Sequence, residues 1–229
     1  MLPKIKTKGK IVFIVSLIIA FGLSFRVGLD KFFYEESDRE ITPPIDAKDE
    51  ADRFIQKASQ NFFYHEFDQS VENYKKAITL FEERKNFKRA AKTYESIGDV
   101  YNFSRNSKEA KKAYLAAVDY HQKIQDKIGE GRAMKKIGEF YMERSELDKA
   151  GKWFGMAVTK VKDAKPNVIK AKIYEIQGHY FLKKEQISNA LGAFQKAKTT
   201  FDKIGYPLGY DNISPMIKKL KRQQKNNAT

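Results

Sequence analysis

The sequence predicts an all-α protein in which helical hairpins stack as an α-α superhelix, with about four repeats, a C-terminal capping helix and one N-terminal transmembrane helix. Two observations lead to this prediction. Small and aromatic residues recur every forty positions between residues 51 and 206, and an uncharged apolar segment follows a lysine cluster near the N-terminus. A fixed period of about 20–50 residues is typical of solenoids and other repeat architectures.

The first predicted element is a membrane segment at residues 11–29. Residues 1–10 contain four lysines, and residues 11–25 carry no charge. As a helix those uncharged residues reach about 22 Å, and with Arg26 extended toward water the whole segment reaches about 28 Å, close to the roughly 30 Å of a hydrocarbon core. An uncleaved signal anchor is the favoured interpretation, and a cleaved signal peptide is the alternative.

The charges beside this segment predict its orientation. The lysines all precede it, whereas acidic and basic residues are mixed after it. Basic flanks stay on the cytoplasmic side of a membrane. We therefore expect a single-pass protein with a basic cytoplasmic N-terminus at residues 1–10 and repeats on the opposite side, which is periplasmic in a bacterium. Residues 30–50 include Pro43 and Pro44, which interrupt a helix, and are expected to form a stalk.

The repeat region is defined by five columns of residues whose members are forty positions apart. The columns are Gly98, Gly138 and Gly178; Ala110, Ala150 and Ala190; Ala117, Ala157 and Ala197; Tyr114, Phe154 and Phe194; and Tyr101, Tyr141 and Phe181. A weaker unit precedes them, so four units cover residues 51–206. Each unit carries two apolar stripes at helical spacing, which predicts two helices. The small residues allow those helices to approach closely, and the aromatic residues fill the remaining space.

This ladder of small, aromatic and Ala residues resembles the tetratricopeptide repeat, and residues 126–141 are similar to its forty-residue variety. The resemblance covers about two-thirds of the chain. It implies a protein-binding superhelix whose first helices line a concave groove, and it says little about the ligand. The proline that usually ends the second helix is missing, so the second helices are expected to run on. A weaker likeness is to the helical-hairpin adaptors of vesicle fusion.

In the architecture that this resemblance implies, three columns on the first helices lie off the packing stripe and point into the groove. They are Lys92, Arg132 and Lys172; Glu95, Lys135 and Glu175; and Asp99, Glu139 and His179. The first column is uniformly basic, and such a row fits an acidic peptide or a C-terminal carboxylate. The competing interpretation is a solvated face of a Lys-rich protein, in which Glu95 and Asp99 neutralise Lys92 internally.

Composition narrows the function classes. The formal net charge is +15, and ten of the basic residues lie in residues 1–29 and 216–229, which contain no acidic residue. Basic ends fit lipid headgroups, and no nucleic-acid motif accompanies them. The chain has no Cys, its three histidines (His65, His121 and His179) lack metal-site spacing, and Gly129-Glu130-Gly131 lies between predicted helices with no strand before it. We therefore expect no cofactor, metal or catalytic residue, and no nucleic acid or small-molecule substrate.

Residues 207–229 are expected to form a capping helix and a basic tail, with Ser214 as N-cap and Pro215 as the first helical residue. A solenoid needs such a cap to cover the exposed end of its core.

Together these features predict a non-enzymatic, membrane-anchored scaffold or adaptor that binds other proteins or extended peptides at the membrane surface, with a chaperone-like role in envelope assembly or secretion. The alternative is a structural subunit built permanently into a larger membrane complex.

Overall fold

The computed structural model describes residues 49–226, so the predicted anchor at residues 11–29 and nearly all of the predicted stalk lie outside the described residues. Every regular element from residue 49 to residue 226 is an α-helix. The helices are α3 (Glu50–Phe63), α4 (Phe67–Glu83), α5 (Phe87–Phe103), α6 (Ser107–Lys123), α7 (Lys127–Glu143), α8 (Leu147–Val161), α9 (Val168–Lys183), α10 (Ile187–Lys203) and α11 (Pro207–Asn226). Within this range no helix is both long and apolar enough to cross a membrane.

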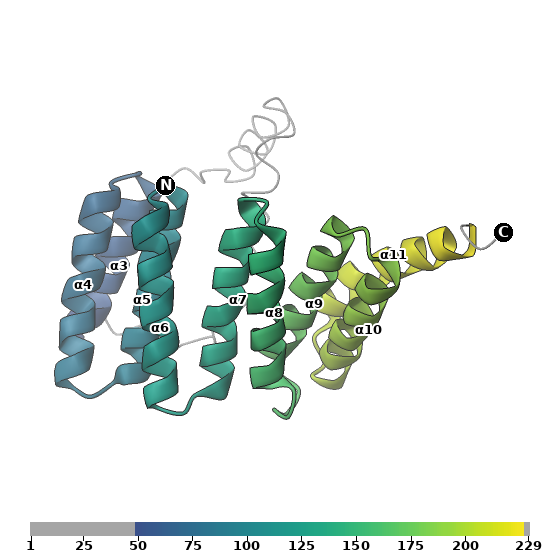
Figure 1. The fold of residues 1–229 in the computed structure, drawn as a ribbon. Coiled ribbons are helices and arrows are strands. Elements are labelled where there is room, and N and C mark those ends of the chain that lie inside the picture. The colour runs from purple at the N-terminus through teal and green to yellow at the C-terminus, as the bar shows by residue number, and fades with distance from the viewer. Residues whose placement is uncertain (1–48, 227–229) are drawn as a thin grey trace, which may run out of the picture. The chain divides into compact units, whose positions relative to one another are not determined.

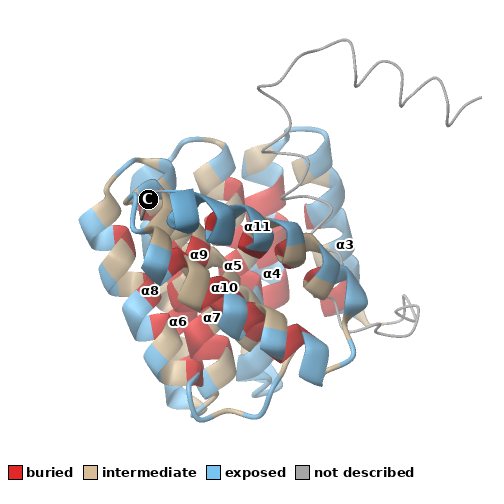
Figure 2. Ribbon diagram, turned by 90° about the vertical axis from the view of Figure 1, so that its right-hand side faces the viewer, coloured by how far each residue is buried: buried red, intermediate tan, exposed pale blue. Residues whose placement is uncertain are grey.

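The helices stand side by side in chain order, from the α3/α4 pair at one end of the stack to α11 at the other (Figure 1). Each predicted unit is one hairpin, with α3, α5, α7 and α9 as first helices and α4, α6, α8 and α10 as second helices. Their buried residues gather on the inner faces and continue from one hairpin to the next (Figure 2). The expected all-helical repeat fold is confirmed for the described residues.

Most of the turns between helices repeat every twenty residues and use one residue in the left-handed region. These residues are His65, Lys85, Arg105, Gln125, Ser145 and Glu185, with φ between 56° and 63°, and Gly205 with φ 65°. After α4, for example, the amide of Asn86 donates to the carbonyl of Phe81 at 2.7 Å, which closes the helix end as a Schellman motif.

The second helices therefore do not run on, and the expectation drawn from the missing proline was wrong. Lys85 and Gln125 terminate α4 and α6 by their left-handed backbone instead. Asn86 then serves twice, because its side chain also accepts from the Arg89 amide and caps α5.

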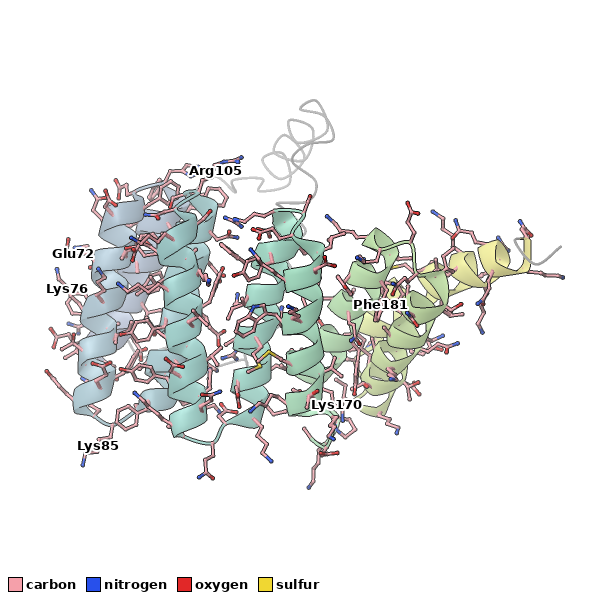
Figure 3. The ribbon with its side chains drawn as sticks, viewed as in Figure 1. Glu72, Lys76, Lys85, Arg105, Lys170 and Phe181 are labelled. Carbon is pink, nitrogen blue, oxygen red and sulfur yellow. The ribbon has the colours of Figure 1, made fainter. Side chains whose placement is uncertain are left out.

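The connection from α8 to α9 is the exception to this rule. No residue of this connection has the left-handed backbone found in the other turns, and Pro166 disfavours helical backbone at Lys165 before it. Lys170, labelled in Figure 3, compensates. Its Nζ donates to the carbonyls of Lys162 at 2.6 Å and Ala164 at 2.7 Å. Asn167 caps the start of α9 through the Lys170 amide.

The regular spacing of small residues along the chain corresponds to contacts between the helices of each hairpin. A Cβ built on the column glycines would collide with the ring of the aromatic column. The distances would be 2.4 Å for Gly98 and Tyr114, 2.5 Å for Gly138 and Phe154, and 2.6 Å for Gly178 and Phe194. The alanines of the second column, Ala110, Ala150 and Ala190, are fully buried.

Two expectations about helix starts were wrong. α11 begins at Pro207 rather than Pro215, because a proline is equally suited to the first turn at residue 207 and the helix from there buries Ile213 against α10. Pro215 lies inside the helix, and the Ser214 hydroxyl before it donates to the Tyr210 carbonyl at 2.7 Å. Gly129-Glu130-Gly131 forms the buried first turn of α7 instead of a connection between helices.

Candidate functional site

The first helices of the first three units, α3, α5 and α7, are linked from one unit to the next by ion pairs. In each pair the basic residue follows the acidic residue by 37 positions. This spacing is shorter than the forty-residue repeat by about one turn of helix. The pairs are Asp52 with Arg89, Glu95 with Arg132, and Asp99 with Lys136. Much of the charge on the predicted groove wall is therefore neutralised by the neighbouring unit.

The predicted basic column is not a uniform row of available cations. Arg132 donates from Nε to Glu95 Oε2 at 2.9 Å and from Nη2 to Oε1 at 3.1 Å, and its side chain is only 16% exposed. Lys92 is exposed and Lys172 is half-buried. In the first unit the same column holds Asp52, so its sign changes along the stack.

The other two columns lie partly inside the packing between units. Glu95 is buried, and Lys135 pairs with Glu139 at 3.4 Å on the same helix. Asp99 accepts from the Tyr114 hydroxyl at 2.7 Å, and burial together with this carboxylate raises the pKa of Tyr114 well above its usual range. The remaining two members, Glu175 and His179, are half-buried.

The surroundings of His179 are mostly apolar. Its ring meets the ring of Phe194 edge to face at 5.1 Å, and burial lowers its pKa although Glu139 opposes the effect. The structure therefore brings the three columns onto neighbouring first helices, where many of their members take part in holding those helices together.

A second surface was not predicted from the sequence, and we call it the aromatic corner. It lies where α3 turns into α4, beside the end of α5, and comprises Phe62, Phe63, Tyr64, His65, Phe67 and Phe103. Phe63, Tyr64 and Phe103 are 64%, 69% and 56% exposed. Arg105, in the turn after α5, marks this end of the helices in Figure 3.

Ring contacts join four residues of the aromatic corner into one cluster and the other two into a separate pair, Phe63 with Tyr64. The Phe62 and Phe103 centroids are 5.3 Å apart, and the His65 ring stacks on Phe103 at 5.7 Å. A sequence signal existed, because Phe63 and Phe103 are forty residues apart. The same column holds Glu143 and Lys183 in the later units, where the helix ends are polar.

No group of three or more His, Asp or Glu side chains within residues 49–226 is placed to hold a metal ion. What the described surface offers instead is exposed aromatic area at one corner and paired charges along the first helices.

Antiparallel helix pairs repeated every forty residues define a tetratricopeptide-like helical-repeat solenoid. The profile of the family described as "Soluble NSF attachment protein, SNAP" matches residues 31–203. Because that match covers most of the chain, the protein belongs to the SNAP family. No curated protein matches it by sequence.

Solved structures add a likeness of fold alone. The apo form of RapI superposes with a TM-score of 0.63 at 13% identity, over 77% of this chain and 49% of RapI, so the match spans about half of that protein. BtubC (BKLC) from P. vanneervenii gives a TM-score of 0.43 at 10% identity, over 78% of this chain and 93% of BtubC.

Proposed function

We propose that this protein is a membrane-anchored adaptor that attaches to other proteins at a membrane surface and takes part in secretion or envelope assembly. Its anchor is the segment at residues 11–29, and its repeats lie on the side opposite the basic N-terminus. The name of the SNAP family describes attachment to another protein, NSF, and a helical-repeat scaffold is suited to the same kind of role.

The observation that carries this proposal is the aromatic corner. Phe63 and Tyr64 are 64% and 69% exposed and meet edge to face at 5.3 Å, and Phe103 is 56% exposed in the ring cluster with Phe62 and His65. Exposed aromatic residues gathered at one end of the helices are typical of interaction sites, and aromatic residues supply much of the energy of protein interfaces. The predicted peptide-binding role of Lys92 and Lys172 is a second contact on the same partner.

The test is crosslinking and capture from intact membranes with the full chain. Replacing Phe63 and Tyr64 together by Ser is expected to reduce partner capture at least tenfold while the thermal midpoint stays within a few degrees. The matched control replaces Phe87 and Leu208 by Ser, two exposed apolar residues outside the corner. Equal capture by both variants and the parent protein would exclude the corner as the contact surface.

The same experiment separates the adaptor from the structural subunit. An adaptor yields several partners whose amounts change with growth conditions, whereas a permanent subunit yields one set of partners in fixed stoichiometry. Alkaline extraction of the membranes tests the anchor, because an uncleaved span at residues 11–29 stays in the pellet with Met1 or Leu2 at its N-terminus.

A further inference from the structure

His121 occupies a column whose other members are apolar. Forty residues before and after it stand Phe81 and Val161, and the fourth unit has Phe201. All four side chains are at most 1% exposed. At this position the second helix of each unit packs against the next element of the stack, so in the second unit alone a titratable ring replaces the apolar contact.

The His121 ring lies between two carboxylates from different elements. Its Nε2 is 3.1 Å from Glu95 Oε1 on α5, and its Nδ1 is 3.3 Å from Oδ2 of Asp126, the N-cap of α7. Gly129 presses on the ring from the first turn of α7, where a Cβ would lie 2.2 Å from Nδ1. Nδ1 makes no hydrogen bond, so its approach to Asp126 is an ion-pair contact. Carboxylate oxygens beside both ring nitrogens favour imidazolium, because only that form carries a proton on each nitrogen.

Among the four groups in direct contact, His121, Glu95, Asp126 and Arg132, the charges balance when His121 holds its extra proton. Glu95 and Asp126 bring two negative charges, and Arg132 brings one positive charge through its bonds to Glu95. The remaining charged groups nearby are Lys136, which pairs with Asp99; Lys88, which attracts Asp126; and Glu130, which pairs with Lys160. A neutral ring leaves the buried part of the cluster with a net negative charge.

The proton equilibrium is a consequence of this geometry. Burial favours the neutral ring, but Asp126 and Glu95 outweigh it and raise the pKa of His121 above 6.5. The ring in turn holds the pKa of Asp126 well below its usual range. Because the folded protein keeps this proton to higher pH than the unfolded chain, the stabilisation is complete below about pH 6.5 and is lost as pH rises through the folded pKa.

We propose that the junction between the second and third repeats is a pH-sensitive joint, in which protonated His121 ties the end of α6 to α5 and to the first turn of α7. Loss of the proton loosens this contact. The joint lies between the units that carry the aromatic corner and the units that lead to α11, so it controls the coupling between these two parts of the solenoid.

The same chain contains an apolar version of this joint. Eighty residues further on, Phe201 takes the place of His121 and Gly209 takes the place of Gly129. A Cβ on Gly209 would lie 2.7 Å from the Phe201 ring, so the packing is alike. Tyr206 stands where Asp126 stands in the titratable joint, and its ring lies 5.4 Å from that of Phe201 at a tilt of 35°. Phenylalanine therefore fits this kind of joint, and His121→Phe is the natural control.

The first measurement is the thermal midpoint of the full chain and of His121→Phe at pH 6.0 and pH 8.5. The parent midpoint is expected to fall by about 2–4 °C more than that of the variant. His179 contributes with the opposite sign, because burial lowers its pKa, but it is common to both proteins. Should His121→Phe fail to fold, His121→Gln replaces it, since Gln keeps one hydrogen bond and cannot titrate.

The second measurement distinguishes local loosening at the joint from a change in the stability of the whole protein. Hydrogen exchange at the Gly129 amide, which donates to Asp126 at 2.9 Å, is expected to lose protection several-fold between pH 6.0 and pH 8.5 after correction for intrinsic rates. The Tyr210 amide, which donates to the Tyr206 carbonyl at 3.3 Å in the apolar joint, should keep its protection. An NMR titration of His121 gives its pKa directly. A value below 6.5, an equal loss of protection at Tyr210, or the same pH response in His121→Phe overturns the proposal.

Discussion

Gly138 on α7 lies directly against the ring of Phe154 on α8, where a Cβ would approach Cε1 of the ring to 2.5 Å. Both residues are buried, and Phe154 is completely inaccessible. The absence of a side chain at residue 138 therefore sets how closely the two helices of the third unit approach. Gly155 and Gly192, by contrast, have open space where a Cβ would stand.

Gly138→Leu is expected to destabilise the protein by about 1–3 kcal/mol, because the added side chain overpacks a full contact. The loss of stability should extend into the second and fourth units, since each repeat is stabilised by its neighbours. Gly155→Ala is the control and should gain up to about 1 kcal/mol from helix propensity alone. Chemical denaturation measures both. An unchanged midpoint for Gly138→Leu would contradict the contact.

Lys85→Gly is expected to stabilise the protein. Lys85 adopts φ 56° in the turn after α4, and a left-handed conformation costs a residue with a Cβ about 1–2 kcal/mol. Glycine avoids that cost but loses more chain entropy on folding, which leaves a net gain of about 0.5–1 kcal/mol. The converse change, Gly205→Ala, should destabilise. A loss of stability in Lys85→Gly would show that the lysine side chain has a structural role.

Glu95→Ala is expected to cost about 3–5 kcal/mol, because it leaves Arg132 and His121 buried without their shared carboxylate. The control is Glu72→Ala on the outer face of α4. Glu72 pairs with Lys76 at 2.6 Å on an exposed surface (Figure 3), and a solvent-exposed pair of this kind should give no measurable change. Similar losses in the two variants would argue against the buried network.

Charge reversal on the basic column should have two distinct effects. Lys92→Glu combined with Lys172→Glu tests peptide binding and should weaken partner capture, more at low salt than at high salt. Arg132→Glu should instead destabilise the fold, because it turns a carboxylate toward Glu95. Capture assays at two salt concentrations, beside thermal melts, separate these outcomes. If the double variant captures partners as well as the parent protein, the basic column is only a solvated face and does not bind the partner.

The forty-residue columns predicted the helix pairs and their close contacts because equivalent positions in a solenoid have equivalent surroundings. Gly98, Gly138 and Gly178 each face an aromatic ring that stands sixteen residues later in the sequence. The turns were less visible, because the left-handed position is occupied by residues such as His65, Lys85 and Arg105 rather than by glycine. Two prolines were each compatible with the start of α11, and burial of Ile213 decided between them.

The sequence by itself determined the period, the helical class and the small-against-aromatic packing, since these depend on burial patterns that repeat along the chain. The tertiary structure alone decided which charges meet. The 37-residue offset between Glu95 and Arg132 depends on how one unit is rotated and shifted against the next. The position of His121 between Glu95 and Asp126 depends on three elements at once. Such contacts are set by the geometry between repeats, which no column of similar residues encodes.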